Sequence, residues 1–222
     1  MNDIKRNVSE ILAICELEPE MKNIFVEGWT DKVVIDRFLN KEHLYGVNVY
    51  PMDMVGFDEE YMTMTEQKCA RLKSCNKEKV VYLASKVEEK VDGCRMLCII
   101  DRDWDTLFSK ESNGRYLAYT DYNSMESYLY REEYIQEVVL NIFRIMGNFD
   151  VKAFMASVEH ICRFLFHLHG LLIPLNAKMV DIDKNLTYDR QTNCCKLDEG
   201  KLIVKIIQKN TKIQFLLIFL IR

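Results

Sequence analysis

The stretch Cys98–Thr106, CIIDRDWDT, decides both the fold and the candidate site, because an apolar run leads directly into three acidic residues. Asp101, Asp103 and Asp105 stand at alternate positions, so like charges are crowded immediately after a predicted strand. Two unit charges about 4 Å apart repel each other by roughly 4 kcal/mol at an effective dielectric constant of about 20. A cluster of this kind needs a counter-charge, and a divalent cation is the simplest candidate.

Composition places the chain among globular proteins with one main core. The 222 residues are 49% hydrophobic and 29% charged, which is typical of a soluble domain with room for an appended piece. The formal net charge of -4 excludes a basic field over the whole surface, so any contact with nucleic acid has to be local.

Cysteine usage and the chain ends bear on location. The 8 cysteines follow no CxxC spacing, and the N-terminal residues are amphipathic rather than a signal peptide, so we expect reduced thiols, no zinc site and a cytoplasmic location. The apolar run IQFLLIFLI at 213–221 is shorter than the roughly 18 residues of a membrane-spanning helix, so no membrane association is expected. Whether another subunit covers this run, or the chain is a shortened form, is left open.

Apolar runs alternate with helical patterns on both sides of the opening stretch. Ile24–Val26 is a short predicted strand, and the residues at 30–39 have helical spacing. Further strands are predicted at 46–54, 94–100 and 114–120, and further helices at 59–73, 77–91 and 122–146. Strands that alternate with helices predict an α/β fold in which a parallel sheet is covered by helices on both faces.

The last third of the chain is predicted to be a mostly helical extension. The pattern at 149–173 is strongly apolar and helical, and KLIVKII at 201–207 predicts one more strand. Only 3 prolines and 8 glycines are present, and no low-complexity linker separates the parts. We therefore predict a first domain at 1–135 and an extension at 136–222 that is docked on the sheet.

Acidic residues close two of the predicted strands, Glu27 the first and Asp101 the third. In an open parallel sheet, ligands bind beyond the carboxyl ends of the strands, so both residues are expected at that edge. If extended geometry continues past Asp101, the period of two places Asp103 on the same face, while Asp105 lies in the loop.

The motif FVEGWTDKVVIDRFL precedes a hydrophobic strand that ends in IIDRDWD. This order, an acid and a glycine after the first strand and a DxD after a later one, resembles the TOPRIM family. The resemblance implies a Rossmann-type TOPRIM-like fold with a magnesium site that acts on phosphodiester bonds. Carried over by position, Glu27, Asp101 and Asp103 take the catalytic and metal-binding roles, and Asp31 belongs to the EGxxD form of the motif.

The segment YTDYNSMESYL places Asn123 and Glu126 at the start of a helix after a strand. The order EG..D, DRD.D and N..E.YL is similar to that of the TOPRIM-like effector nucleases of two-gene anti-phage defence systems (PARIS type), over residues 23 to about 130. This similarity implies Mg²⁺ (or Mn²⁺) as cofactor, RNA such as tRNA or DNA as substrate, and an ABC-type ATPase as partner. Glu126 becomes a further metal ligand, and Asn123 and Asp105 support the site. A homodimer is left open.

Each of these acids also has a structural alternative. Asp31 fits a helix N-cap as well as a site residue, and Glu27 before Gly28 fits a solvated turn. Asp105 fits a cap or turn acid, and Glu126 fits a first-turn acid that faces the helix dipole.

Three neighbouring residues are candidates for contact with nucleic acid. Trp29 offers a ring on which a base can stack, although it fits a lid over the core equally well. Lys32 offers a charge for the phosphate backbone, although charges on helices are usually solvated. Arg102 points to the opposite face of an extended strand, where pairing with another carboxylate is the alternative.

Other enzyme classes account for less of the pattern. A haloacid-dehalogenase-type phosphatase places its paired aspartates near the N-terminus, followed by Thr or Val, whereas DWDTL lies far into the chain and offers Leu107. A glycosyltransferase would use the DxD but would leave FVEG without a role. The remaining alternative is a non-catalytic TOPRIM-like module that binds nucleic acid or a partner, whose fold magnesium would not stabilise by mass action.

Overall fold

The fold was analysed in a computed structural model that describes residues 5–57, 76–142, 144 and 149–210. The chain divides into two compact units, Met1–Tyr130 and Arg131–Arg222. The helix predicted at 59–73 and the apolar run at 213–221 lie outside the described residues. Among the described helices, none is both long and apolar enough to cross a membrane.

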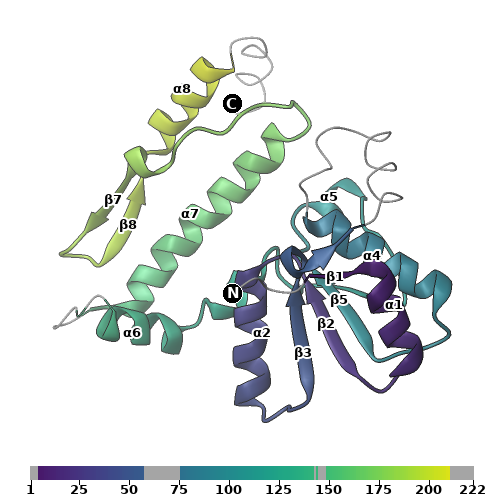
Figure 1. Ribbon diagram of the computed structural model, residues 1–222. Helices are drawn as coiled ribbons and strands as arrows, with labels where there is room; N and C mark the ends of the chain where they lie inside the picture. Colours follow the sequence, from purple (N-terminus) through teal and green to yellow (C-terminus); the bar gives the residue numbers. More distant parts are fainter. Residues whose placement is uncertain (1–4, 58–75, 143, 145–148, 211–222) are drawn as a thin grey trace. The chain divides into compact units, whose positions relative to one another are not determined.

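The first unit is built on a parallel sheet of four strands in the order β3-β2-β5-β6 (Figure 1). The strands are β2 (Lys22–Val26), β3 (Val47–Pro51), β5 (Met96–Ile100) and β6 (Leu117–Tyr119). β2 pairs in parallel with β3 and β5, and β5 pairs in parallel with β6. Because all four strands run the same way, their carboxyl ends share one edge of the sheet.

Two helices cover one face of this sheet. The helices α1 (Val8–Leu17) and α4 (Asn76–Lys90) each bury one apolar stripe against β2 and β5, with buried positions three or four residues apart. The strands supply alternate residues to the same cluster, as their period of two requires. The buried contacts of this face include Val8, Ile11, Cys15, Phe25, Val80, Leu83, Val87, Met96, Cys98 and Ile100.

The opposite face is covered by α2 (Trp29–Lys41) and by the short 3-10 helix η3 (Met125–Leu129). Val34 and Ile35 of α2 pack with Val26, Val49 and Met125 in a second buried cluster. The predicted α/β fold, with helices on both faces of a parallel sheet, is therefore confirmed.

A small ladder of two parallel strands accompanies the main sheet, between β1 (Arg6–Asn7) and β4 (Val55–Gly56), which follows the 3-10 helix η1 (Met52–Met54). Asn7 also caps α1, because its side chain accepts the Glu10 N–H at 2.8 Å while the Glu10 carboxylate accepts the Asn7 N–H at 2.9 Å. This reciprocal capping box fixes where α1 begins. The sequence analysis does not predict either strand.

The single helix predicted at 122–146 is wrong, because the chain forms η3 and then a separate helix α6 (Glu132–Asn141). Arg131 between them is extended, with φ -128° and ψ 146°, which ends one helix and begins the next. An apolar pattern with helical spacing continues through this break, so periodicity alone could not find it.

The second unit contains α6, the long helix α7 (Val151–Leu172), the 3-10 helix η4 (Asp183–Asn185), the antiparallel pair β7 (Leu186–Asp189) and β8 (Cys194–Leu197), and α8 (Glu199–Lys209). α7 agrees with the helical pattern at 149–173. The predicted docking of this part on the sheet stays a prediction.

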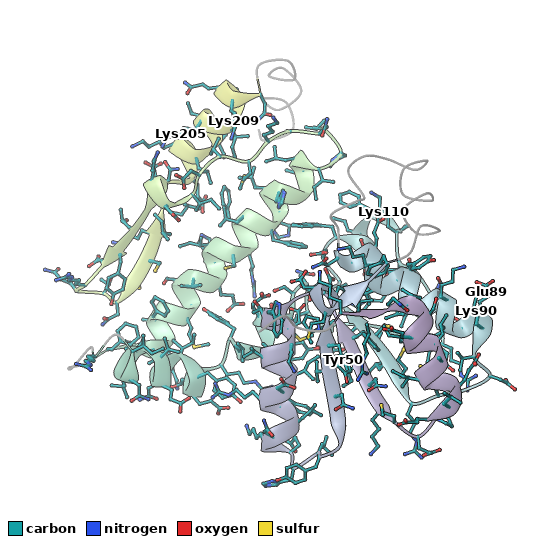
Figure 2. The ribbon with its side chains drawn as sticks, viewed as in Figure 1. Tyr50, Glu89, Lys90, Lys110, Lys205 and Lys209 are labelled. Atoms are coloured by element: carbon teal, nitrogen blue, oxygen red, sulfur yellow. The ribbon has the colours of Figure 1, made fainter. Side chains whose placement is uncertain are left out.

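The strand predicted at 201–207 is wrong, because KLIVKII lies within α8. Leu202 and Ile206, four residues apart, are both fully buried, whereas Val204 between them is 51% exposed. The Asp198 carboxylate accepts the Lys201 N–H at 2.9 Å and starts the helix. Lys205 and Lys209, labelled in Figure 2, tie α8 to the chain before β7 by bonds of 2.8 Å to the Asn185 side chain and the Met179 carbonyl.

Candidate metal centre

Glu27 and Asp101 meet at the carboxyl edge of the sheet. Glu27 directly follows β2 and Asp101 directly follows β5, the strand paired with it. The Glu27 Oε1 accepts the Asp101 N–H at 2.9 Å, so the glutamate side chain reaches from the end of one strand to the end of the next. The structure thus brings together the two acids that the sequence places at this edge.

Asp101 is held a second time by the chain that follows β6. Its Oδ1 accepts the N–H of Met125, at the start of η3, at 2.8 Å. The first amides of a helix have no partner within the helix, so they suit a carboxylate. Asp101 therefore joins three segments of the first unit at one point.

Asp103 reaches the site through a turn rather than through a continued strand. β5 ends at Ile100, and Asp103 has a φ of 47°, in the left-handed region. Its N–H donates to the Asn123 carbonyl at 2.9 Å, which fixes the turn against the chain after β6. The chain is therefore not extended beyond Asp101, so the strand period of two does not account for the position of Asp103. Asp105 begins the short helix α5 (Asp105–Phe108).

The Lys77 ammonium lies among the aspartates. Its Nζ donates to the Asp101 carbonyl at 2.5 Å, to Asp103 Oδ2 at 2.8 Å, and pairs with Asp105 Oδ2 at 2.9 Å. The Lys77 side chain is only 14% exposed. The preceding residue, Asn76, donates from Nδ2 to the Glu27 carbonyl at 2.9 Å. The first turn of α4 is thus tied to the ends of β2 and β5.

Burial and crowding of like charges raise the pKa values of the two central acids. The pKa of Glu27 rises from 4.5 to about 7, first because of burial and then because of the Asp101 charge, while the Asp101 N–H and Lys77 oppose the rise. The pKa of Asp101 rises from 3.8 to about 6, first because of burial and then because of Asp31, Asp103 and Glu126, while the Met125 N–H opposes it. Neighbouring carboxylates thus add to the effect of burial at both acids.

Asp31 and Glu126 lie at the margin of the centre. Asp31 is 9% exposed, and its Oδ2 accepts the N–H of Gly28 at 2.8 Å. Gly28 is the N-cap residue of α2, so Asp31 is the third residue of the helix and not its N-cap, although its carboxylate still satisfies the N-cap amide. Burial, and then the charge of Glu126, raise the pKa of Asp31. Glu126 itself is exposed in η3. The charges of Asp31 and Glu126 both act on Asp101, so they belong to its electrostatic surroundings.

The three candidates for nucleic-acid contact differ in how they are engaged. Trp29 is 47% exposed at the start of α2, whereas Lys32 forms an ion pair of 2.8 Å with Asp36. The Arg102 Nε donates to the Thr120 carbonyl at 2.9 Å, and its guanidinium pairs with Glu111 at 3.5 Å. Arg102 thus pairs with a carboxylate, which is the alternative that the sequence leaves open.

The structure adds three residues to those that the sequence predicts at the centre: Lys77, which the sequence offers only as part of a basic helix surface, Asn76 and Thr120. The Thr120 hydroxyl accepts the Arg102 N–H at 3.1 Å and donates to the Tyr122 carbonyl at 2.6 Å, joining the turns after β5 and β6. One signal for Lys77 exists in the sequence. A lysine in the first turn of a helix opposes the helix dipole, so its presence there suggests nearby acids.

The chemistry of the donor set fits magnesium. The side chains of the four acids offer only oxygen atoms, the ligands that magnesium prefers: Glu27, Asp101, Asp103 and Asp105. The positively charged Lys77 ammonium already contacts oxygens of the three aspartates. Among the described residues, no group of three or more Asp, Glu, His or Cys side chains is arranged so that it could hold a metal ion. One oxygen each of Glu27, Asp101 and Asp103 is already bonded to a protein donor, so a bound ion would exchange some of these bonds.

Neither protein-family models nor curated proteins give a match to this chain.

Proposed function

We propose that this chain is a magnesium-dependent nuclease of TOPRIM-like type that cleaves phosphodiester bonds in RNA, such as tRNA, or in DNA. The observation that carries the proposal is the hydrogen bond of 2.9 Å from the Asp101 N–H to Glu27 Oε1, which joins the acids that end two neighbouring parallel strands. The pKa values of both acids are raised, first by burial and then by neighbouring acids, and such perturbed carboxylates are common at functional sites, which supports the proposal. The motif order resembles that of TOPRIM-like nucleases, which supports the reaction type.

Each residue has a role that its surroundings favour. Glu27 and Asp101 would hold the ion, with Asp103 and Glu126 as further ligands. Bound magnesium would act as a Lewis acid on the phosphate and would lower the pKa of the attacking water. As an alternative to holding the ion, Glu27 would accept a proton from the attacking water, and a bound cation would lower its pKa below the value of about 7 that it has without one. The Met125 N–H orients Asp101.

The substrate and the partner follow from exposure and resemblance. Trp29, which is 47% exposed and two residues after Glu27, would stack on a base of the substrate. Lys32 would contact the phosphate backbone after leaving Asp36. The resemblance supports a role as an anti-phage defence effector held in check by an ABC-type ATPase.

The test is incubation of the purified protein with tRNA, single-stranded DNA and duplex DNA, with magnesium or with a chelator. We expect magnesium-dependent cleavage that is lost in Asp101→Asn, whose amide oxygen still accepts the Met125 N–H. Glu20→Gln is the matched control, because Glu20 is 78% exposed, pairs with Arg95 and lies just before β2, away from its carboxyl end. Cleavage that Asp101→Asn leaves intact would overturn the proposal.

A second function, a non-catalytic TOPRIM-like module for nucleic acid or a partner protein, is favoured by one observation. In the described part of the chain, no complete metal-ligand group stands ready. For this module, magnesium would leave the melting temperature unchanged, whereas a filled carboxylate site raises it by mass action.

A further inference from the structure

The acidic centre is divided into two parts by Lys77. Asp103 and Asp105 each give a carboxylate oxygen to the Lys77 ammonium, at 2.8 and 2.9 Å, and the Asp101 carbonyl gives a third oxygen at 2.5 Å. The three N–H donors of one ammonium are thereby matched by three oxygens. Glu27 and the Asp101 carboxylate, in contrast, accept backbone amides.

The Lys77 ammonium is held at its position against two unfavourable factors, burial and the helix dipole. The Lys77 side chain is 14% exposed, although a lysine normally keeps its charge in water. Lys77 is the second residue of α4, where the helix dipole disfavours a cation. Asn76 anchors the same turn to the Glu27 carbonyl at 2.9 Å, so the ammonium is held at a fixed place relative to β2 and β5. Three short contacts to oxygens offset both costs.

Pairs of divalent ions commonly serve phosphodiester cleavage, each ion being held by carboxylates. At this centre, the oxygens of Asp103 and Asp105 that would hold a second ion are bonded to Lys77. The Arg102 guanidinium is engaged with Glu111 and the Thr120 carbonyl instead. Lys77 is therefore the cation that the geometry assigns to this half of the centre.

We propose that Lys77 permanently fills the second cation position, so that the centre takes a single divalent ion, at Glu27 and Asp101, to which Asp103 would add only the carboxylate oxygen that is not bonded to Lys77. The inference rests on the proposed function for the identity of that ion as magnesium or manganese. Lys77 acts through Asp103 and Asp105, so it is a positioning residue, and Asp105 serves the lysine rather than the metal.

The test counts bound ions in the full chain by equilibrium dialysis against Mn²⁺, followed by metal analysis. We expect one ion in the wild type and two in Lys77→Met, which keeps the length of the side chain but removes its charge. Lys77→Arg restores a cation and is expected to bind one ion. Lys79→Met is the matched control, because Lys79 lies two residues further along α4 and contacts Asn76 and Phe57 instead.

A second variant covers the case in which Lys77→Met does not fold. Asp105→Asn in the wild-type background does not depend on the folding of Lys77→Met and is expected to leave one ion bound, because Asp105 contacts Lys77 rather than the ion. Where Lys77→Met does fold, adding Asp105→Asn is expected to return its count from two to one. Two ions in the wild type, an unchanged count in Lys77→Met, or loss of the ion in Asp105→Asn would overturn the inference. These outcomes leave the nuclease proposal standing, because that proposal is decided by cleavage and by Asp101→Asn.

Discussion

Replacing Glu27 by Gln is expected to stabilise the metal-free protein at alkaline pH, although it removes a proposed metal ligand. In the folded chain, the pKa of Glu27 is raised from 4.5 to about 7, first by burial. The folded carboxyl therefore keeps its proton at pH values where the unfolded one has lost it. Since the folded state binds more protons in this window, the free energy of unfolding falls as pH rises from about 4.5 to about 7.

The size of the effect follows from this difference. A difference of about 2.5 in pKa, at about 1.4 kcal/mol for each pKa unit, gives about 3.5 kcal/mol, and partial exposure to water reduces this to roughly 2 kcal/mol. Gln keeps an oxygen that accepts the Asp101 N–H, so the variant removes the charge and leaves the hydrogen bond. Glu27→Gln is thus expected to be more stable than wild type by roughly 2 kcal/mol at pH about 8, and nearly equal to it at pH about 4.

The assay is urea denaturation in the presence of a chelator, followed by tryptophan fluorescence. The chain has 2 tryptophans, Trp29 and Trp104, and both lie in the first unit, so the signal reports on the unit that holds the centre. Glu20→Gln serves again as the control and is expected to change stability little at either pH. A Glu27→Gln protein that is less stable than wild type at alkaline pH, or a difference independent of pH, would refute the reasoning.

Three further predictions concern the centre and the two cores. Magnesium binding is expected to weaken as pH falls below about 7, because Glu27 and Asp101, with pKa values of about 7 and about 6, must lose their protons to bind it; an equal magnesium-induced rise in melting temperature at pH about 5 and about 8 would contradict this. Thr120→Val is expected to lower the free energy of unfolding by about 1–3 kcal/mol, because it removes the buried hydroxyl that links the turns after β5 and β6. Thr120→Ser keeps the hydroxyl and is expected to be more stable than Thr120→Val, which the urea denaturation midpoints of the two variants will show. Leu202→Ala is expected to cost about 2–5 kcal/mol, measured by circular dichroism during denaturation, and the exposed Val204→Ala should cost far less.

The sheet and its helices could be predicted because each short-range pattern agrees with the final packing. The strand that ends at Ile100 is a continuous apolar run, in which Met96, Cys98 and Ile100 are buried on one face and Ile99 is partly buried on the other. The acids after β2 and β5 could be placed at one edge because parallel strands share a direction. That argument needs only strand order and polarity, and no side-chain detail.

The failures have a common physical origin in contacts that sequence spacing does not encode. Val204 sits where a strand would bury it, yet the Asp198 cap and the burial of Leu202 and Ile206 favour a helix. Asp103 itself has a positive φ, and this turn brings it to the centre. Neither the strand period nor the helix period in the sequence predicts such a turn. Lys77 comes from a helix that precedes β5, and only the fold brings its ammonium to the aspartates.

Glu27 and Asp101 are 74 residues apart in the chain, and this separation has a consequence during translation. When the nascent chain has left the ribosome as far as the end of α2, Glu27 is present but Asp101 has not yet emerged. The second acid is held in place only after β5 has paired and Met125 has left the exit tunnel. The centre is therefore completed late in the folding of the first unit, because the segments that hold its two central acids extend from β2 to η3.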